Sequence, residues 1–153
     1  MRSLELKVPP VLVAAISAGA MWILARVADG LAVALPGGKV LAAVLGAAGI
    51  GVAALGVATF RRARTTVNPA RPDAASSLVT EGVYRYSRNP MYLGIVLALL
   101  GWAAFLANVA ALAVVPAFVA WMNAFQIAPE ERVLAAKFGA AFSGYREKVR
   151  RWI

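Results

Sequence analysis

The chain has 153 residues, of which 61% are hydrophobic, and its sixteen lysines and arginines against seven acidic residues give a formal net charge of +9. An ordinary soluble domain is only about half apolar, so this composition predicts an integral-membrane protein. The absence of cysteine and histidine excludes disulfides, thiolate nucleophiles and imidazole acid–base chemistry. We expect one all-α, polytopic membrane domain over residues 1–153, with no metal site.

Two apolar runs come first along the chain. The first covers about residues 11–35, and it is long enough to span because about 20 residues cross the hydrocarbon. Arg26 and Asp29 lie three residues apart in its last third, where they are expected to pair or to reach the far interface. The second run, 40–60, carries alanine and glycine at four-residue spacings, which favours close packing of helix backbones.

A third apolar stretch, 91–127, contains no charge. As one helix it would be roughly 55 Å long, well beyond a hydrocarbon layer of about 30 Å, so it must fold back on itself. Asn108 is the natural turn, which predicts a helical hairpin of two spans, 91–106 and 109–127. Pro116 is expected to kink the second of them.

The basic residues predict the orientation of these four spans. The N-terminus, the loop after the second span and the tail after residue 127 would lie on one side of the membrane. All the lysines and arginines except Arg26 and Lys39 fall in these segments, fourteen of the sixteen. The positive-inside rule therefore predicts cytoplasmic termini. The high charge is explained by topology and by attraction to anionic lipid, so no nucleic-acid partner is expected.

Two polar segments, 65–94 and 128–152, are candidates for function. In the first, Asn89 suits an N-cap and Pro90 the first helical position. The same helix start presents free N–H groups, and neighbouring Arg88 adds positive charge, which suits a carboxylate or phosphate. Local sequence leaves both interpretations open, a simple helix start or a ligand site.

The second segment is expected to be an amphipathic helix at the membrane surface. Pro129 suits its first position, and the helix dipole favours Glu130 and Glu131 in the first turn. Its apolar side chains recur at intervals of three or four residues, so they form a stripe that would lie on the loop or in the interface. These side chains are Leu134, Phe138, Phe142 and Tyr145.

Two motifs resemble a known signature. The first is LVTEGVYR at 78–85 followed by RNPMYLG at 88–94. The second is EE at 130–131, followed by Leu134, Phe138-Gly139 and Tyr145. The signature is that of the isoprenylcysteine carboxyl methyltransferase and phospholipid methyltransferase superfamily of integral-membrane methyltransferases. The resemblance covers about residues 65–152. It implies S-adenosylmethionine as cofactor, S-adenosylhomocysteine as product, and a pocket at the cytoplasmic face.

The resemblance also implies which residues bind the cofactor. The adenosine part would lie against the loop, the methionine part against the start of the third span, and the ammonium or ribose hydroxyls against the acidic pair, while Gly94 would permit close approach. The implied binding residues are Leu78, Val79, Thr80, Gly82, Val83, Tyr84, Arg88, Asn89, Pro90, Tyr92, Gly94, Glu130 and Glu131. Many family members carry histidine where Asn89 stands, so a role that needs an imidazole is excluded here.

The implied reaction is methyl transfer to a hydrophobic or lipid-like acceptor in the bilayer. Because the cofactor carries an activated methyl group, the protein chiefly positions the reactants. Arg88 would orient an anionic acceptor, and Glu131 would take the proton from an amine or alcohol. Two alternatives remain open: an NADPH-dependent membrane reductase of the related sterol-reductase type, and a noncatalytic membrane interaction module.

Overall fold

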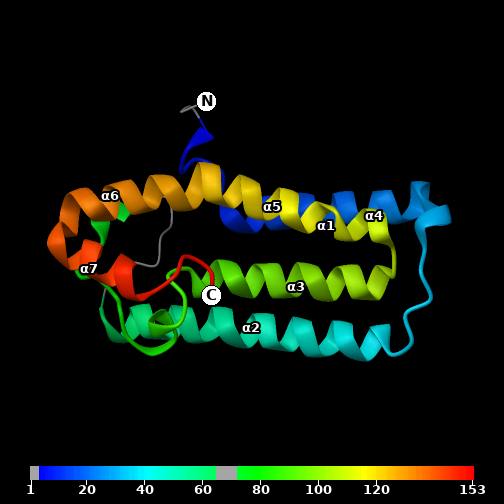
Figure 1. The fold of residues 1–153 in the computed structure, drawn as a ribbon, viewed down its shortest axis with the longest axis horizontal. Helices are drawn as coiled ribbons and strands as arrows, with labels where there is room; N and C mark the ends of the chain where they lie inside the picture. Colours follow the sequence, from blue (N-terminus) through cyan, green and yellow to red (C-terminus); the bar gives the residue numbers. More distant parts are fainter. Residues whose placement is uncertain (1–3, 65–71) are drawn as a thin grey trace.

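The computed structural model describes residues 4–64 and 72–153, and the chain in these ranges is built from helices. Long helical rods run side by side and alternate in direction (Figure 1). They are α1 (Pro10–Val27), α2 (Gly38–Arg62), α3 (Pro90–Leu106) and a continuous rod from Val109 to Phe138. That rod comprises α4 (Val109–Leu112), α5 (Val114–Met122), a π-helical turn η5 (Asn123–Ile127) and α6 (Ala128–Phe138), and α7 (Ala140–Lys148) follows it.

Three of these rods are long and apolar enough to cross a membrane: α1, α2 and the rod of 30 residues that begins at Val109. The fourth, α3, is an apolar helix of 17 residues. The chain is therefore a multi-pass membrane protein, as its composition indicates. Part of the expected site segment, residues 65–71, lies outside the described residues.

The first span is shorter than predicted. It ends at Val27 rather than near residue 35, because Asp29 and Gly30 are poor helix formers and the chain turns there into a short 3-10 helix, η2 (Asp29–Leu31). Asn108 Nδ2 donates to the Ala28 carbonyl at 2.8 Å. This bond satisfies a carbonyl just past the helix end, which is otherwise without an intrahelical donor.

The expected pairing of Arg26 with Asp29 is not among the ion pairs of the described residues. Asp29 lies beyond the end of α1, so the two side chains do not share its helical face. The guanidinium of Arg26 instead lies 5.4 Å from the centre of the Trp22 ring. An arginine and a tryptophan at a helix end suit the membrane interface, in agreement with the alternative of an interfacial arginine.

The hairpin turn at Asn108 is confirmed. Its Oδ1 accepts from the backbone N–H groups of Ala110 and Ala111, so this side chain caps the returning helix. Ala107, in the left-handed conformation, ends α3. In the returning rod the α-helical pattern is interrupted at Ala113, three residues before Pro116. Proline removes one intrahelical donor, so an irregularity is expected in this turn.

The C-terminal helix is not separate from the last span, contrary to the prediction. The rod continues through the π-helical turn and ends only at Gly139, whose φ is +51°. Pro129 cannot donate to the Phe125 carbonyl four residues earlier, and the Leu6 N–H of the N-terminal segment bonds that carbonyl at 3.1 Å. Because 30 residues measure about 45 Å, α6 projects beyond a hydrocarbon layer of about 30 Å, and we take 109–127 as the span.

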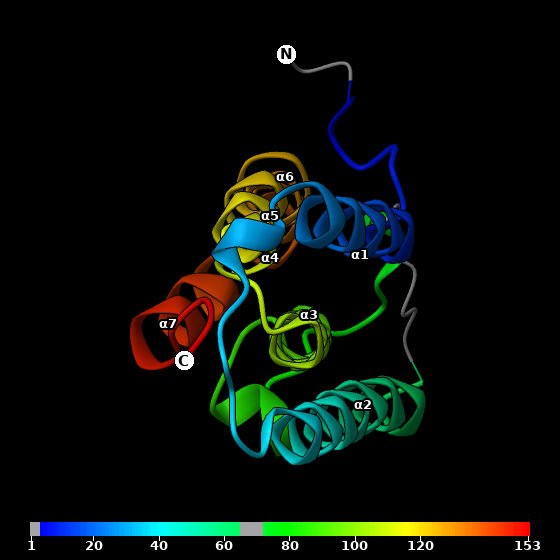
Figure 2. The same ribbon diagram turned by 90° about the vertical axis from the view of Figure 1, so that its right-hand side faces the viewer.

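Glycines bring α2 and α3 into backbone contact. A Cβ atom added to Gly49 would lie 2.5 Å from the Gly94 carbonyl oxygen, and one added to Gly94 would lie 2.5 Å from the Gly49 oxygen. Figure 2 shows α3 at the centre, with α2 on one side and α1 and α5 on the other. The small residues of α2 therefore have the structural role that their spacing indicates, and Gly94 packs against α2.

Candidate functional site

A cavity of about 840 Å³, its open mouth included, lies where α3, α6 and α7 meet the loop, by which we mean the described residues 72–89 between α2 and α3. Eight of the predicted binding residues line it, and they come from all these segments except α7. They are Leu78, Val79, Tyr84, Arg88, Asn89, Tyr92, Glu130 and Glu131. The structure thus brings together two motifs that are separated by the apolar hairpin.

The other five predicted residues do not line the cavity. Gly82 has a φ of +58° and packs on Thr59 of α2, Pro90 is buried at the start of α3, and Gly94 faces α2. Thr80 and Val83 belong to the same loop but are not part of the wall. These residues shape the loop and the helix start rather than the cavity surface.

Sequence reasoning missed several lining residues. Three of them, Leu134, Phe142 and Tyr145, belong to the apolar stripe that the sequence places on the loop or in the membrane interface, and in the structure this stripe packs against Leu78 of the loop. The remainder are small or apolar side chains from the end of α2, the loop and the start of α3, and of these only Met91 lies within one of the two motifs. They are Phe60, Pro72, Ala75, Ser77 and Met91.

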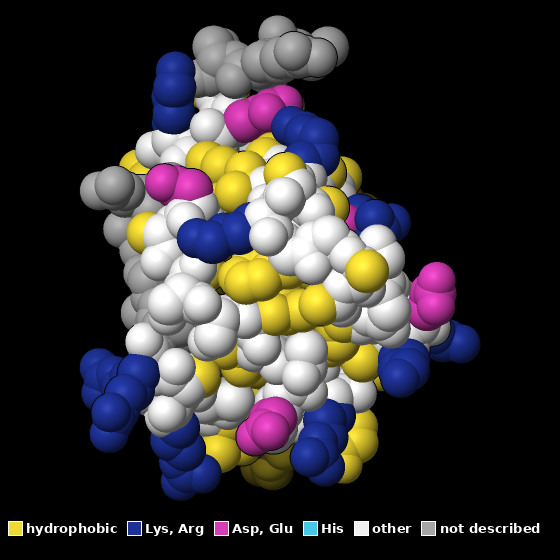
Figure 3. Space-filling view, turned by 90° about the vertical axis from the view of Figure 1, so that its left-hand side faces the viewer, with side chains coloured by type: hydrophobic (Ala, Val, Ile, Leu, Met, Phe, Trp, Pro, Cys, Tyr) yellow, Lys and Arg dark blue, Asp and Glu magenta, His cyan; other side chains and the backbone are white. Residues whose placement is uncertain are grey.

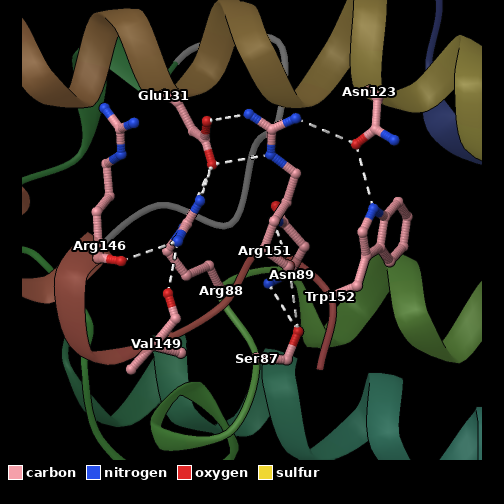
Figure 4. A network of polar contacts seen from close by, with 9 residues as sticks. All are labelled: Ser87, Arg88, Asn89, Asn123, Glu131, Arg146, Val149, Arg151 and Trp152. Atoms are coloured by element: carbon pink, nitrogen blue, oxygen red, sulfur yellow. Dashed lines mark hydrogen bonds and ion pairs between the residues drawn. The ribbon is translucent and has the colours of Figure 1, made fainter.

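Glu131 is held between two arginines (Figure 4). Its Oε1 lies 2.7 Å from Arg88 Nη2, and its Oε2 lies 2.5 Å from Arg151 Nη2. The side chains of Glu131 and Arg88 are each only 11% exposed, whereas that of Arg151 is 35% exposed. One carboxylate therefore neutralises only half of the positive charge of these two guanidiniums, and the cluster is cationic.

Arg88 is fixed by further bonds. Its Nη1 donates to the backbone carbonyls of Val149, at 2.5 Å, and Arg146, at 3.3 Å. Its neighbour Asn89 occupies the expected N-cap position of α3, but its side chain makes no cap bond there. The Asn89 Nδ2 instead donates to the Arg151 carbonyl at 3.0 Å. Both residues of this motif are thus tied to the C-terminal residues.

Glu130 has different partners from Glu131. Its Oε1 accepts from the Tyr92 hydroxyl and from Gln126 Nε2, both at 2.7 Å. These are its hydrogen bonds among the described residues, and both go to one oxygen. The second oxygen, Oε2, accepts no hydrogen bond from the described residues.

The two carboxyl groups, which lie on α6 beyond the span, differ in acidity. Burial raises the pKa of Glu130 to about 7, and the hydrogen bonds from Tyr92 and Gln126 oppose that increase. Burial also acts on Glu131, but the hydrogen bonds from Arg151 and Arg88 outweigh it and hold its pKa below the usual value. Near neutral pH, Glu131 is a fixed anion, whereas Glu130 can hold or release a proton.

Two tyrosines join α7 to the loop. The Tyr145 hydroxyl donates to the Tyr84 carbonyl at 2.7 Å. Burial raises the pKa of Tyr145 to about 12 and raises that of Tyr84 further above its usual value. Both phenols are therefore neutral hydrogen-bond donors at physiological pH, and this bond holds the apolar wall of the cavity together.

The cavity offers two kinds of surface to a ligand. Apolar side chains such as Val79 and Phe142 cover much of it, while Arg88, Asn89 and Glu130 supply charge and hydrogen bonds. Ser77 Oγ is buried in its lining and has no hydrogen-bond partner among the described residues. A buried hydroxyl without a partner is costly, so a bound polar group that met this oxygen would gain binding energy.

Comparison with known proteins shows the family of the chain. Residues 38–141, more than half of the chain, match the family model described as phospholipid methyltransferase, and the chain belongs to that family. A segment of 63 residues, 41% of the chain, is 46% identical to an uncharacterized protein of Haemophilus influenzae and covers the whole length of that protein. No solved structure matches the chain.

Proposed function

We propose that this protein transfers a methyl group from S-adenosylmethionine to a lipid-like acceptor. The observation that carries the proposal is the cavity in which Arg88, Glu130 and an apolar wall meet, in a chain of the phospholipid methyltransferase family. Methyltransferases of this kind need a site for a charged cofactor next to an apolar site for the acceptor. The cavity combines both surfaces at the end of the transmembrane bundle.

The residues present fit the cofactor. Arg88, within a cationic cluster and beside the N-terminus of α3, suits its carboxylate. Glu130, with one oxygen free of hydrogen bonds from the described residues, remains for the acceptor. Leu78 and Val79 offer an apolar surface to the adenosine, and Ser77 Oγ, which has no partner among the described residues, can bond one of its polar atoms.

When bound, S-adenosylmethionine would supply a methyl group already activated on a sulfonium. The task of the protein is then to orient the reactants and exclude water. An amine or hydroxyl acceptor must also lose a proton. The resemblance implies Glu131 for this proton, but both oxygens of Glu131 bind arginines, so we assign the role to Glu130, which has one free oxygen and a pKa close to neutral.

The acceptor is proposed to enter from the bilayer. Phe60 at the end of α2 and Met91 at the start of α3 line the cavity, and both belong to apolar helices. An acyl or prenyl chain would remain between helices while its head reaches Arg88 and Glu130. These features favour a lipid over a soluble small molecule as the acceptor.

Binding is tested with purified protein in nanodiscs by titration calorimetry. We expect saturable binding of S-adenosylhomocysteine and none of NADPH. Binding of NADPH alone would favour the reductase alternative, and binding of neither ligand would favour a noncatalytic module. S-adenosylhomocysteine is the suitable probe because it carries no transferable methyl group.

We further propose that the cavity faces the cytoplasm. Figure 3 shows lysine and arginine side chains around this end of the molecule, and exposed examples are Arg61, Arg85 and Lys137. The positive-inside rule supports this orientation. The native chain has no cysteine, so Ile153→Cys provides a single label site. A membrane-impermeant thiol reagent should label it only after cells are permeabilised, and labelling of intact cells would overturn the assignment.

A further inference from the structure

Residues 149–152, which we call the strap, follow α7 and lie between the start of α3 and the long rod (Figure 4). On the α3 side, the Arg88 N–H donates to the Arg150 carbonyl, and Asn89 Nδ2 donates to the Arg151 carbonyl, each at 3.0 Å. The strap lies beyond the segment matched by the family model, which ends at residue 141. Its role is therefore not given by that match.

The strap also binds the long rod that contains α6. Arg151 contacts both oxygens of Glu131, through Nη2 at 2.5 Å and Nε at 3.2 Å. At the start of the π-helical turn, Asn123 Oδ1 accepts from Trp152 Nε1 at 3.2 Å and from Arg151 Nη1 at 3.4 Å. The strap thus joins the start of α3 to the rod that carries the acidic pair, two elements on either side of the cavity.

We propose that the strap sets the geometry of the cofactor site. Arg151 is the positioning residue, and it holds the carboxylate of Glu131 in the orientation in which that carboxylate binds Arg88. The consequence for ligand binding rests on the function proposed above. Arg151 does not line the cavity, so it would act through Glu131 rather than by touching the ligand.

The hydrogen-bond geometry explains why a second arginine is needed. Arg88 alone binds only Oε1 of Glu131, through Nε at 3.3 Å and Nη2 at 2.7 Å, which leaves the carboxylate free to rotate about that oxygen. The bond from Arg151 to Oε2 removes this freedom. The second guanidinium also keeps a net positive charge beside the cavity, which suits the carboxylate of the ligand.

Arg151→Gln and Arg150→Gln form a matched pair for the test. Both remove one arginine from the strap, but the side chain of Arg150 is exposed, and among the described residues only its backbone carbonyl takes part in the contacts given above. Arg151→Lys keeps the charge and loses the planar fork that contacts both oxygens. Each variant is combined with Ile153→Cys, whose position is 75% exposed and suits a nitroxide spin label.

The first measurement needs no ligand. We expect the electron paramagnetic resonance spectrum of the label to show greater mobility in Arg151→Gln than in the parent, an intermediate value in Arg151→Lys, and no change in Arg150→Gln. In the Glu131→Gln background, Arg151→Gln should add little, because the partner is already altered. Equal mobility in Arg151→Gln and the parent, or an equal increase in Arg150→Gln, would overturn the proposal.

The second measurement is the dissociation constant of S-adenosylhomocysteine. Loss of a charge-assisted contact predicts about tenfold weaker binding in Arg151→Gln, partial recovery in Arg151→Lys and no change in Arg150→Gln. Unchanged affinity in Arg151→Gln contradicts the positioning role. If the parent protein itself does not bind, the proposed function fails, whereas the label mobility still decides whether the strap is held through Arg151.

Discussion

Glu131→Ala is expected to weaken binding of S-adenosylhomocysteine about 100-fold or more. The change removes the carboxylate that lies between Arg88 and Arg151 and leaves two guanidiniums without their common partner. Removing one member of a buried ion pair costs about 3–5 kcal/mol, and the partial exposure of Arg151 reduces this toward about 3 kcal/mol. Without Glu131, the two guanidiniums repel each other, and the site must restore Arg88 to its position when the ligand binds. Since about 1.4 kcal/mol corresponds to a tenfold change, a cost of about 3 kcal/mol weakens binding by about two orders of magnitude.

Titration calorimetry in nanodiscs measures this loss, and Glu147→Ala is its control. Glu147 is an exposed carboxylate on α7, and its removal changes the net charge by the same amount. We expect Glu147→Ala to bind like the parent. Equal affinities of Glu131→Ala and the parent would mean that the cluster of Glu131 with its two arginines is not part of the binding site.

The second large effect concerns the contact between α2 and α3. We expect Gly49→Ala to destabilise the protein by about 3 kcal/mol, at the upper end of the usual cost of overpacking. The reason is that the new Cβ atom would lie 2.5 Å from the Gly94 carbonyl oxygen, and backbone cannot move aside as a flexible side chain can. The two helices must separate, and with them Phe60, which lines the cavity from α2.

Gly51→Ala is the matched control, because it lies two residues further along α2 and an added Cβ atom meets nothing within 4 Å. The midpoint of thermal unfolding in detergent should fall in Gly49→Ala and stay at or above the parent value in Gly51→Ala. Equal midpoints for the two variants would show that the close approach of these helices does not limit stability.

Much of the fold was predictable because membrane spans depend on local composition. Apolar runs of sufficient length and the turn at Asn108 are properties of adjacent residues, and α2, α3 and the hairpin have nearly the predicted bounds. The end of α1 and the continuity of the last rod were not predictable in this way. Asp29 and Gly30 weaken the helix locally, but the partners that complete these two places are distant in sequence, namely Asn108 for the Ala28 carbonyl and Leu6 for the Phe125 carbonyl.

In the site, too, the features that depend on adjacent residues were predictable, and those that depend on distant residues were not. The motifs that contain Arg88 and the acidic pair are local, and the structure places them on one cavity. The different environments of Glu130 and Glu131 were not predictable, because Tyr92 and Arg151 reach them from other parts of the chain. Gly94 was assigned to the cofactor because its small size fits close approach, but that approach is to Gly49.

Transfer of a labelled methyl group tests the central claim most directly. Purified protein in nanodiscs made from total membrane lipid is incubated with S-adenosylmethionine that carries a radioactive methyl group, and the lipids are then extracted and separated. We predict label in a lipid species with the parent protein and with Glu147→Ala, and much less label with Glu131→Ala when S-adenosylmethionine is not saturating. Absence of labelled lipid with a parent protein that binds S-adenosylhomocysteine would contradict lipid methyl transfer.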